Sequence, residues 1–209
     1  MQNPVRSVME HALIIFIKNP VLGKVKTRLA SSLGDKTALE IYKSLMDHTR
    51  LVVSGIDAAR LLFYSDRVER HDSWPEKKFS KNVQQGDDLG IRMLNAFKQV
   101  SDYDKKVIIG SDCLGITQQL IEQAYTHLDF HDVVIGPSED GGFYLLGMNV
   151  LIPELFQNIP WSTDQVLPEI VKILQQKRLL YKLLPTLRDI DTQEDWEAEK
   201  AKLVREQTI

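Results

Sequence analysis

The sequence predicts an α/β fold, a three-layer α/β/α arrangement whose sheet is mixed but mostly parallel. Short β-branched apolar runs alternate with longer segments whose apolar residues repeat at helical spacing. Several of the short runs end at once in Gly, Asp, Asn or Pro, as buried strands that lead into loops do. The chain has 209 residues, 43% of them hydrophobic, and no repeat or Gly/Ser-rich linker divides it. We therefore expect one domain over residues 1–209, with its core at about 12–196.

The elements follow in order from these patterns. The first strand is expected at 12–17, where an apolar run ends at Lys18. Residues 35–54 carry apolar side chains on one helical face, and Asp35 is the expected cap of that helix. Further strands are expected at 60–64, 82–85 (a weaker pattern), 106–109, 132–135, 143–148 and 179–184, and further helices at 89–100, 117–128 (capped by Thr117), 163–176 and 193–202.

Composition excludes several classes of protein. The chain carries 26 Lys and Arg against 29 Asp and Glu, a net charge of −3, which argues against a general nucleic-acid binder. The longest clean apolar run, 12–17, is far shorter than the roughly 18 residues of a membrane span. Residues 1–10 show no secretory signal, so a cytoplasmic location is expected. The single cysteine, Cys113, excludes an intramolecular disulfide and is expected to be a small buried residue rather than a nucleophile.

A cation-rich segment, K-N-P-V-L-G-K-V-K-T-R, follows the first expected strand. It contributes Lys18, Lys24, Lys26 and Arg28, with Gly23 among them. Ligands of α/β sheets bind beyond the carboxyl ends of the strands, where amides and cations can hold a phosphate group and a glycine allows close approach. A solvated basic turn explains the same residues. Neither a Walker A sequence nor a G-x-G-x-x-G sequence is present, so a P-loop nucleotidase and a dinucleotide oxidoreductase are not indicated.

A carboxylate follows the strand expected at 106–109. Asp112 would face the same edge of the sheet as the cation-rich segment. Mg²⁺ binds through one or two carboxylates together with substrate phosphates, so Asp112 suits a metal-bridged diphosphate. Alternatively, Asp112 only caps the turn that leads to the next helix.

Six blocks then occur in order: K-N-P-V-L-G-K-V-K-T-R-L at 18–29, Q-G-D-D-L-G-I-R-M at 85–93, G-S-D-C at 110–113, G-P-S-E-D-G-G-F-Y-L-L-G at 136–147, P-W-S-T at 160–163 and D-I-D-T-Q-E-D-W at 189–196. Together they resemble the bacterial family of predicted transferases with the GT-A, or nucleotide-diphospho-sugar transferase, fold, often called glycosyltransferases. Phospholactate and molybdopterin guanylyltransferases are similar more distantly. Leu114 stands where the family often has proline.

The resemblance implies roles for particular residues. It makes the cation-rich segment the nucleotide-phosphate loop and Asp112 a metal ligand. Gln85 and Gly86 correspond to residues that contact the nucleobase in related nucleotidyltransferases, although an exposed strand end explains Gln85 as well. Asp88 and Arg92 are expected to form an i,i+4 ion pair.

Two later blocks complete the expected site. In the first, Asp140 would orient or deprotonate an acceptor, with Gly141 and Gly142 close to the ligand, unless these residues only form a hairpin turn. Trp161 would stack on a sugar or acceptor, and its neighbours Ser162 and Thr163 are candidate helix caps.

The last block offers the second metal ligand. Asp189 and Asp191 face one side of an extended segment, and we favour Asp191. The alternative is that Asp191 and Thr192 cap the final helix, with Glu194 and Asp195 in its first turn.

These residues predict a Mg²⁺- or Mn²⁺-dependent transferase that takes a nucleotide or nucleotide-sugar donor and a small-molecule acceptor. Lys26 and Arg28 would stabilise the leaving group, and Asp140 would act on the acceptor. Glycosyl transfer is the reaction that we name first. Nucleotidyl transfer to a phosphorylated acceptor, with release of pyrophosphate, is the alternative, and a non-catalytic nucleotide-binding protein is the second. The sugar, base, acceptor and oligomeric state are not determined by the sequence.

Overall fold

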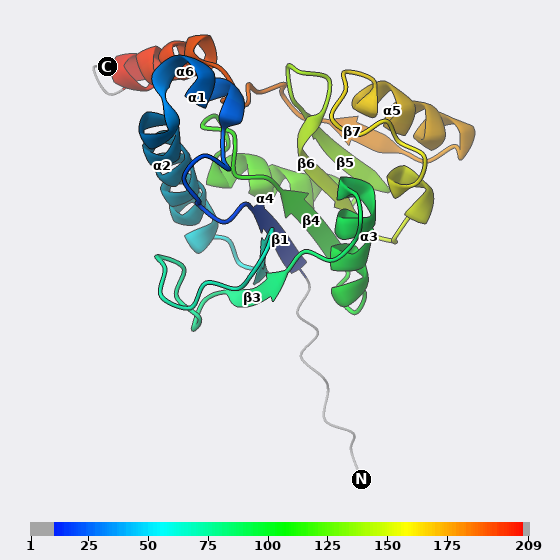
Figure 1. The fold of residues 1–209 in the computed structure, drawn as a ribbon. Coiled ribbons are helices and arrows are strands. Elements are labelled where there is room, and N and C mark those ends of the chain that lie inside the picture. The colour runs from blue at the N-terminus through cyan, green and yellow to red at the C-terminus, as the bar shows by residue number, and fades with distance from the viewer. Residues whose placement is uncertain (1–10, 207–209) are drawn as a thin grey trace.

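The computed structural model describes residues 11–206, with side chains through Lys200. Its centre is a seven-stranded sheet of order β3-β2-β1-β4-β6-β5-β7 (Figure 1). The strands are β1 (His11–Ile17), β2 (Ala59–Tyr64), β3 (Ser80–Val83), β4 (Lys105–Ile109), β5 (Val133–Pro137), β6 (Phe143–Met148) and β7 (Tyr181–Leu183). Only β6 runs antiparallel to its neighbours, so the expected mixed but mostly parallel α/β sheet is confirmed.

Helices cover both faces of this sheet. They are α1 (Thr27–Leu33), α2 (Asp35–Ser54), α3 (Leu89–Gln99), α4 (Gln118–His127), the 3₁₀ turn η1 (Pro153–Phe156), α5 (Val166–Gln176) and α6 (Gln193–Glu206). One core cluster joins the sheet to α2 and α4, and a second joins it to α3, η1 and α5. A third cluster joins α1, α2 and the segment before α6, so α1 and α6 lie together at one end of the molecule (Figure 1).

Alternation along β1 produces these layers. Leu13, Ile15 and Ile17 pack in the cluster with α2 and α4, whereas Ala12 and Ile14 pack in the cluster with α3 and α5. All five side chains are buried. A strand that is buried on both faces has a continuous run of apolar residues, and this run is why β1 could be predicted clearly from the sequence.

Most expected elements form within two residues of their expected ends, and two expected caps are present. The Thr117 hydroxyl accepts from Leu120 N at the start of α4. At the start of α6, Thr192 and Asp195 satisfy each other's backbone N–H groups in a capping box, as the capping alternative anticipates. Asp35, by contrast, is the first residue of α2 rather than its cap, because Gly34 occupies the cap position.

Two local expectations were wrong, and one element was not anticipated. The segment expected as a loop through Arg28 turns into α1 at Thr27. Helix α5 begins at Val166 rather than at 163, and no side chain caps it, because the chain first makes a turn in which Ser162 has a φ of 64°. The element η1 was not anticipated.

The expectation that residues 1–10 hold no secretory signal falls outside the described residues, as do residues 207–209 of the expected domain. Within the described part of the chain, no helix is long and apolar enough to cross a membrane.

Candidate active site

A cavity of about 690 Å³ opens at the carboxyl edge of the parallel strands. Nine of the thirteen site residues predicted from the sequence line it: Lys18, Lys24, Lys26, Arg28, Asp112, Asp140, Gly142, Trp161 and Asp191. Asp189, the other candidate for the second metal ligand, lines it as well. Four others, Gly23, Gln85, Gly86 and Gly141, are not among its lining residues. The structure therefore brings together the cation-rich segment and the carboxylates that follow distant strands.

Lys26 is the centre of the charged part of the cavity. Its Nζ lies 2.7 Å from Asp112 Oδ1 and 3.1 Å from Asp191 Oδ1. The Lys26 side chain is only 5% exposed, whereas Arg28, which reaches Asp191 Oδ2 at 3.7 Å, is 76% exposed. Burial alone would lower the pKa of Lys26, but the two carboxylates outweigh it and raise the pKa above its ordinary value. Lys26 is therefore fully charged at neutral pH.

The backbone holds the two carboxylates close together. Ile190 N donates to Asp112 O at 2.8 Å, and Cys113 and Asp189 form an isolated antiparallel bridge. Asp191 N donates to the carboxylate of Asp195 in the capping box of α6. The segment before α6 is thus fastened to the end of β4, which explains why Asp191 meets Asp112.

Asp189 is a carboxyl group in an unfavourable environment. Burial, together with the nearby Asp112 and Asp140 carboxylates, raises its pKa to about 7, and Lys26 only partly opposes this. Cys113 is also buried, and burial raises the pKa of its thiol to about 12, so it is not a thiolate at neutral pH.

The raised pKa of Asp189 predicts a pH-dependent stability. In the unfolded chain this carboxyl ionises near its ordinary pKa of 3.8, but in the native state it stays protonated until about pH 7. Its contribution therefore destabilises the fold progressively as the pH rises from about 4 to 7. We expect Asp189→Asn to melt at a higher temperature than the wild type at pH 8, and at a similar temperature at pH 4. Thermal denaturation in EDTA measures this, with Asp87→Asn, an exposed carboxylate, as the control.

Asp140 lies in a tight turn between β5 and β6. Its Oδ1 accepts from the Ser138 hydroxyl and from Gly142 N, and Ser138 and Gly142 also pair through their backbones. These contacts match the hairpin-turn alternative, yet Asp140 also lines the cavity. Within the described residues only Oδ1 receives hydrogen bonds, so Oδ2 is available to a ligand.

On the side of β3, Gln84 rather than Gln85 lines the cavity. Gln84 Nε2 donates to Ile17 O and Phe63 O, which fixes its amide at the ends of β1 and β2. Gln85 is exposed, and its carbonyl accepts from Asn95. The strand expected at 82–85 ends in a Gln-Gln pair, and because successive residues face opposite sides, a one-residue difference in strand phase decides which glutamine faces the cavity.

The expected ion pair at the start of α3 does not form. Asp88 instead caps the helix by accepting from Ile91 N at 2.8 Å. Arg92 Nε donates to Gly86 O at 2.9 Å and so anchors the loop before α3. Gly86 lies in this loop with a φ of 140°, a backbone conformation that favours glycine. Gly23 likewise serves a turn: its φ is 74°, and Lys24 N closes the turn onto Val21 O.

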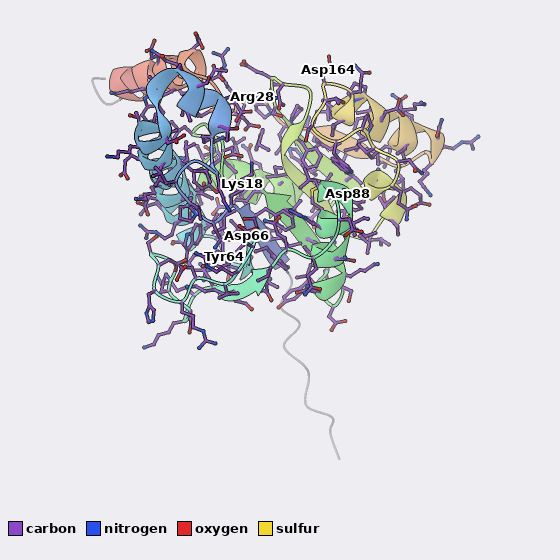
Figure 2. All side chains as sticks on the ribbon, in the orientation of Figure 1. Lys18, Arg28, Tyr64, Asp66, Asp88 and Asp164 are labelled. Atoms are coloured by element: carbon purple, nitrogen blue, oxygen red, sulfur yellow. The ribbon has the colours of Figure 1, made fainter. Side chains whose placement is uncertain are left out.

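The wall of the cavity opposite the cations comes from β6 and the loop before α5. Trp161 lies there with its ring edge-on to Phe143, at a centroid distance of 6.5 Å. Asp164, which sequence reasoning missed, lines the same wall, and Figure 2 shows it across from Arg28 of α1. Its position one residue past the P-W-S-T block is the signal that could have indicated it.

The donor atoms of the cavity suit a hard divalent cation. In the described part of the chain, no three His, Cys, Asp or Glu side chains group closely enough to form a metal site by themselves. Mg²⁺, however, usually takes one or two carboxylates and completes its coordination with substrate phosphates and water. Asp112 and Asp191 provide such an incomplete oxygen set beside four cations that can bind phosphate.

This fold is that of the GT-A, nucleotide-diphospho-sugar transferase superfamily. A protein of Desulfovibrio desulfuricans G20, described as a "putative nucleotide-diphospho-sugar transferase", is 31% identical, and the match covers 88% of this chain and 84% of that one with a TM-score of 0.81. The family model described as "uncharacterized protein conserved in bacteria" (DUF2064) matches residues 49–163. The chain belongs to this family.

More distant structures share the fold. The inositol-1-phosphate CTP transferase of T. maritima is 12% identical, with 90% of this chain and 91% of that one covered and a TM-score of 0.55. Rv0371c of Mycobacterium tuberculosis, in a complex with manganese, is 11% identical, with 92% and 98% covered and a TM-score of 0.56. No curated protein matches the chain.

Proposed function

We propose that this protein is a metal-dependent transferase that takes a nucleotide sugar and transfers the sugar to a small-molecule acceptor. One observation carries the proposal: a single cavity has four cations on one wall and carboxylates beside and opposite them. The description of the 31% identical protein as a putative nucleotide-diphospho-sugar transferase agrees with it, whereas that of the more distant inositol-1-phosphate CTP transferase agrees with the nucleotidyl alternative.

The cation-rich segment would bind the donor diphosphate. Lys18, Lys24 and Arg28 line the cavity on the side of β1 and α1. Their charges would stabilise the diphosphate as it leaves with the electron pair of the broken sugar–oxygen bond. A Mg²⁺ or Mn²⁺ ion, held by Asp112 and Asp191, would supply further neutralisation of that charge.

Asp140 would act on the acceptor. The hydrogen bonds from Ser138 and Gly142 to Oδ1 fix the carboxylate, and Oδ2 accepts none from the described residues. The acceptor hydroxyl would form the new bond to the sugar carbon while its proton passes to Asp140, so that the acceptor oxygen gains the electron pair it needs. Trp161 and Phe143 offer an apolar surface on which a sugar ring can stack.

The charge of the cavity favours glycosyl over nucleotidyl transfer. Five carboxylates line it: Asp112, Asp140, Asp164, Asp189 and Asp191. Outside residues 18–28, no described Lys or Arg lines it, so nothing cationic faces an acceptor phosphate on the Trp161 wall. One observation favours nucleotidyl transfer, because four cations suit the charge of a triphosphate. Lys26, however, is already paired with two carboxylates, so fewer than four cations are free to bind phosphate.

A product assay tests the proposal. The protein is incubated with Mg²⁺ or Mn²⁺ and either nucleotide sugars with neutral polyol acceptors or nucleoside triphosphates with sugar phosphates. We expect nucleoside diphosphate to be released from a nucleotide sugar. Release of pyrophosphate with a sugar phosphate would instead establish nucleotidyl transfer. Binding of nucleotide without turnover, unchanged in Asp112→Ala, would indicate a non-catalytic nucleotide-binding protein.

The position of Gln84 predicts that it contacts the nucleotide. We expect Gln84→Ala to weaken nucleotide binding by roughly tenfold, the loss of about one well-formed hydrogen bond. Gln85→Ala, at the adjacent exposed residue, is the matched control and should bind normally. Calorimetric titration measures both, and melting temperatures show whether loss of the bonds to Ile17 and Phe63 has disturbed the fold. A larger loss in Gln85→Ala would restore the role that the sequence favours for Gln85.

A further inference from the structure

The ammonium of Lys26 occupies the position between the two carboxylates that suit a metal. Nζ is within hydrogen-bond distance of both Asp112 and Asp191, and the side chain is almost fully enclosed. Arg28 is mostly exposed and reaches only Asp191, at 3.7 Å. Lys26 is therefore the internal counter-ion of this pair.

The carboxylate pair does not depend on Lys26 for its position. The hydrogen bond from Ile190 N to Asp112 O, the bridge between Cys113 and Asp189, and the capping box of α6 hold it in place. Lys26 arrives from a different segment, at the residue before α1, and its backbone is left-handed, with a φ of 50°. If the ammonium moved away, the two carboxylates would remain together with no cation between them.

An ammonium and a divalent cation cannot share the same carboxylate oxygens, because like charges at contact distance repel strongly away from bulk water. We infer that Lys26 keeps the Asp112–Asp191 pair closed to metal until a nucleotide phosphate offers its ammonium another anion. Metal and nucleotide binding are then coupled: the phosphate draws Lys26 away, and the metal takes the vacated carboxylates. The role of the nucleotide rests on the proposed function, whereas the competition between Lys26 and metal does not.

Mn²⁺ titration without nucleotide tests the competition. Free Mn²⁺ is followed by electron paramagnetic resonance for wild type, for Lys26→Met, which keeps the length of the side chain without its charge, and for Lys24→Met. Lys24 is exposed on the same segment and loses the same charge. We expect Lys26→Met to bind Mn²⁺ at least about tenfold more tightly than wild type. Lys24→Met should stay within about twofold of wild type, because exposed charges are screened.

Equal or weaker Mn²⁺ binding by Lys26→Met would overturn the inference and leave Lys26 as a structural ion pair. Circular dichroism and melting temperature verify that the variant is folded, and Lys26→Gln replaces it if it is not. The titration is then repeated with UDP or GDP. We expect the nucleotide to increase the Mn²⁺ affinity of wild type more than that of Lys26→Met, since the pair is already open in the variant.

The two failures are distinguishable. If neither UDP nor GDP binds to any form of the protein, the proposed use of these nucleotides fails, while the nucleotide-free comparison still decides whether Lys26 competes with metal. If nucleotide binds but changes the Mn²⁺ affinity of wild type and Lys26→Met by the same factor, the coupling through Lys26 is wrong and the proposed function stands.

Discussion

Asp112→Asn is expected to lower kcat/KM by about 10²-fold or more. Asparagine keeps the shape of the side chain but removes the charge that contacts Lys26 at 2.7 Å and that is proposed to hold the metal. The amide also turns a hydrogen-bond donor toward the position that a cation should occupy. The loss should fall on metal-dependent donor binding and on turnover together. Steady-state kinetics with a nucleotide sugar, at several Mn²⁺ concentrations, measure it.

Asp66→Asn is the matched control for that prediction. Asp66 is exposed just after β2 (Figure 2), much as Asp112 comes shortly after β4. Asp66 does not line the cavity. Its replacement should leave kcat/KM unchanged. Full activity of Asp112→Asn with the same Mn²⁺ dependence as wild type would contradict the assignment of Asp112.

Gly141→Ala is expected to destabilise the fold by roughly 2–6 kcal/mol, through backbone strain and overpacking together. Gly141 has a φ of 87°, and a Cβ there would lie 2.5 Å from the backbone Cα and O of Asp164. Gly141 O also accepts from Leu167 N at the start of α5. The turn that carries Asp140 would therefore have to move away from the Trp161 wall, so activity should fall as well.

Two other glycines separate the effect of backbone strain from that of overpacking. Gly34 has a φ of 82° and no atom within 4 Å of a built Cβ, so Gly34→Ala adds strain alone, about 1–3 kcal/mol. Gly110 has neither a positive φ nor a close neighbour, so Gly110→Ala should cost least. Urea denaturation of the three variants gives the order. A Gly141→Ala variant no less stable than Gly34→Ala would show that the turn and the α5 loop are not packed as described.

Much of the fold follows from the sequence because burial imposes regular patterns. Strand β1, buried on both faces, reads as an uninterrupted apolar run, and α2 shows a continuous apolar face, so both were located closely. Helix α1 was missed because it has only seven residues, no side-chain cap, and Lys26 in a left-handed conformation before it. Such a short element depends on packing against α2 and α6, which no local pattern reports.

The site was predictable where the topology determines it. Lys26 and Asp112 follow strands that are neighbours and parallel, so both were expected at one edge of the sheet, and they are in contact there. The choice between Gln84 and Gln85 depends on strand phase at the end of a weak edge strand, which the residues do not specify. The direct contact of Lys26 with two carboxylates was also not predictable, because it depends on how the segment before α6 is fastened to β4.

We propose that one cavity holds both a metal and a nucleoside diphosphate. Anomalous scattering from Mn²⁺ in crystals grown with UDP or GDP tests it most directly. We expect a manganese peak in contact with Asp112, with the diphosphate beside the cation-rich segment of residues 18–28. A diphosphate bound outside this cavity, or manganese at a place that Asp112 does not reach, would contradict it.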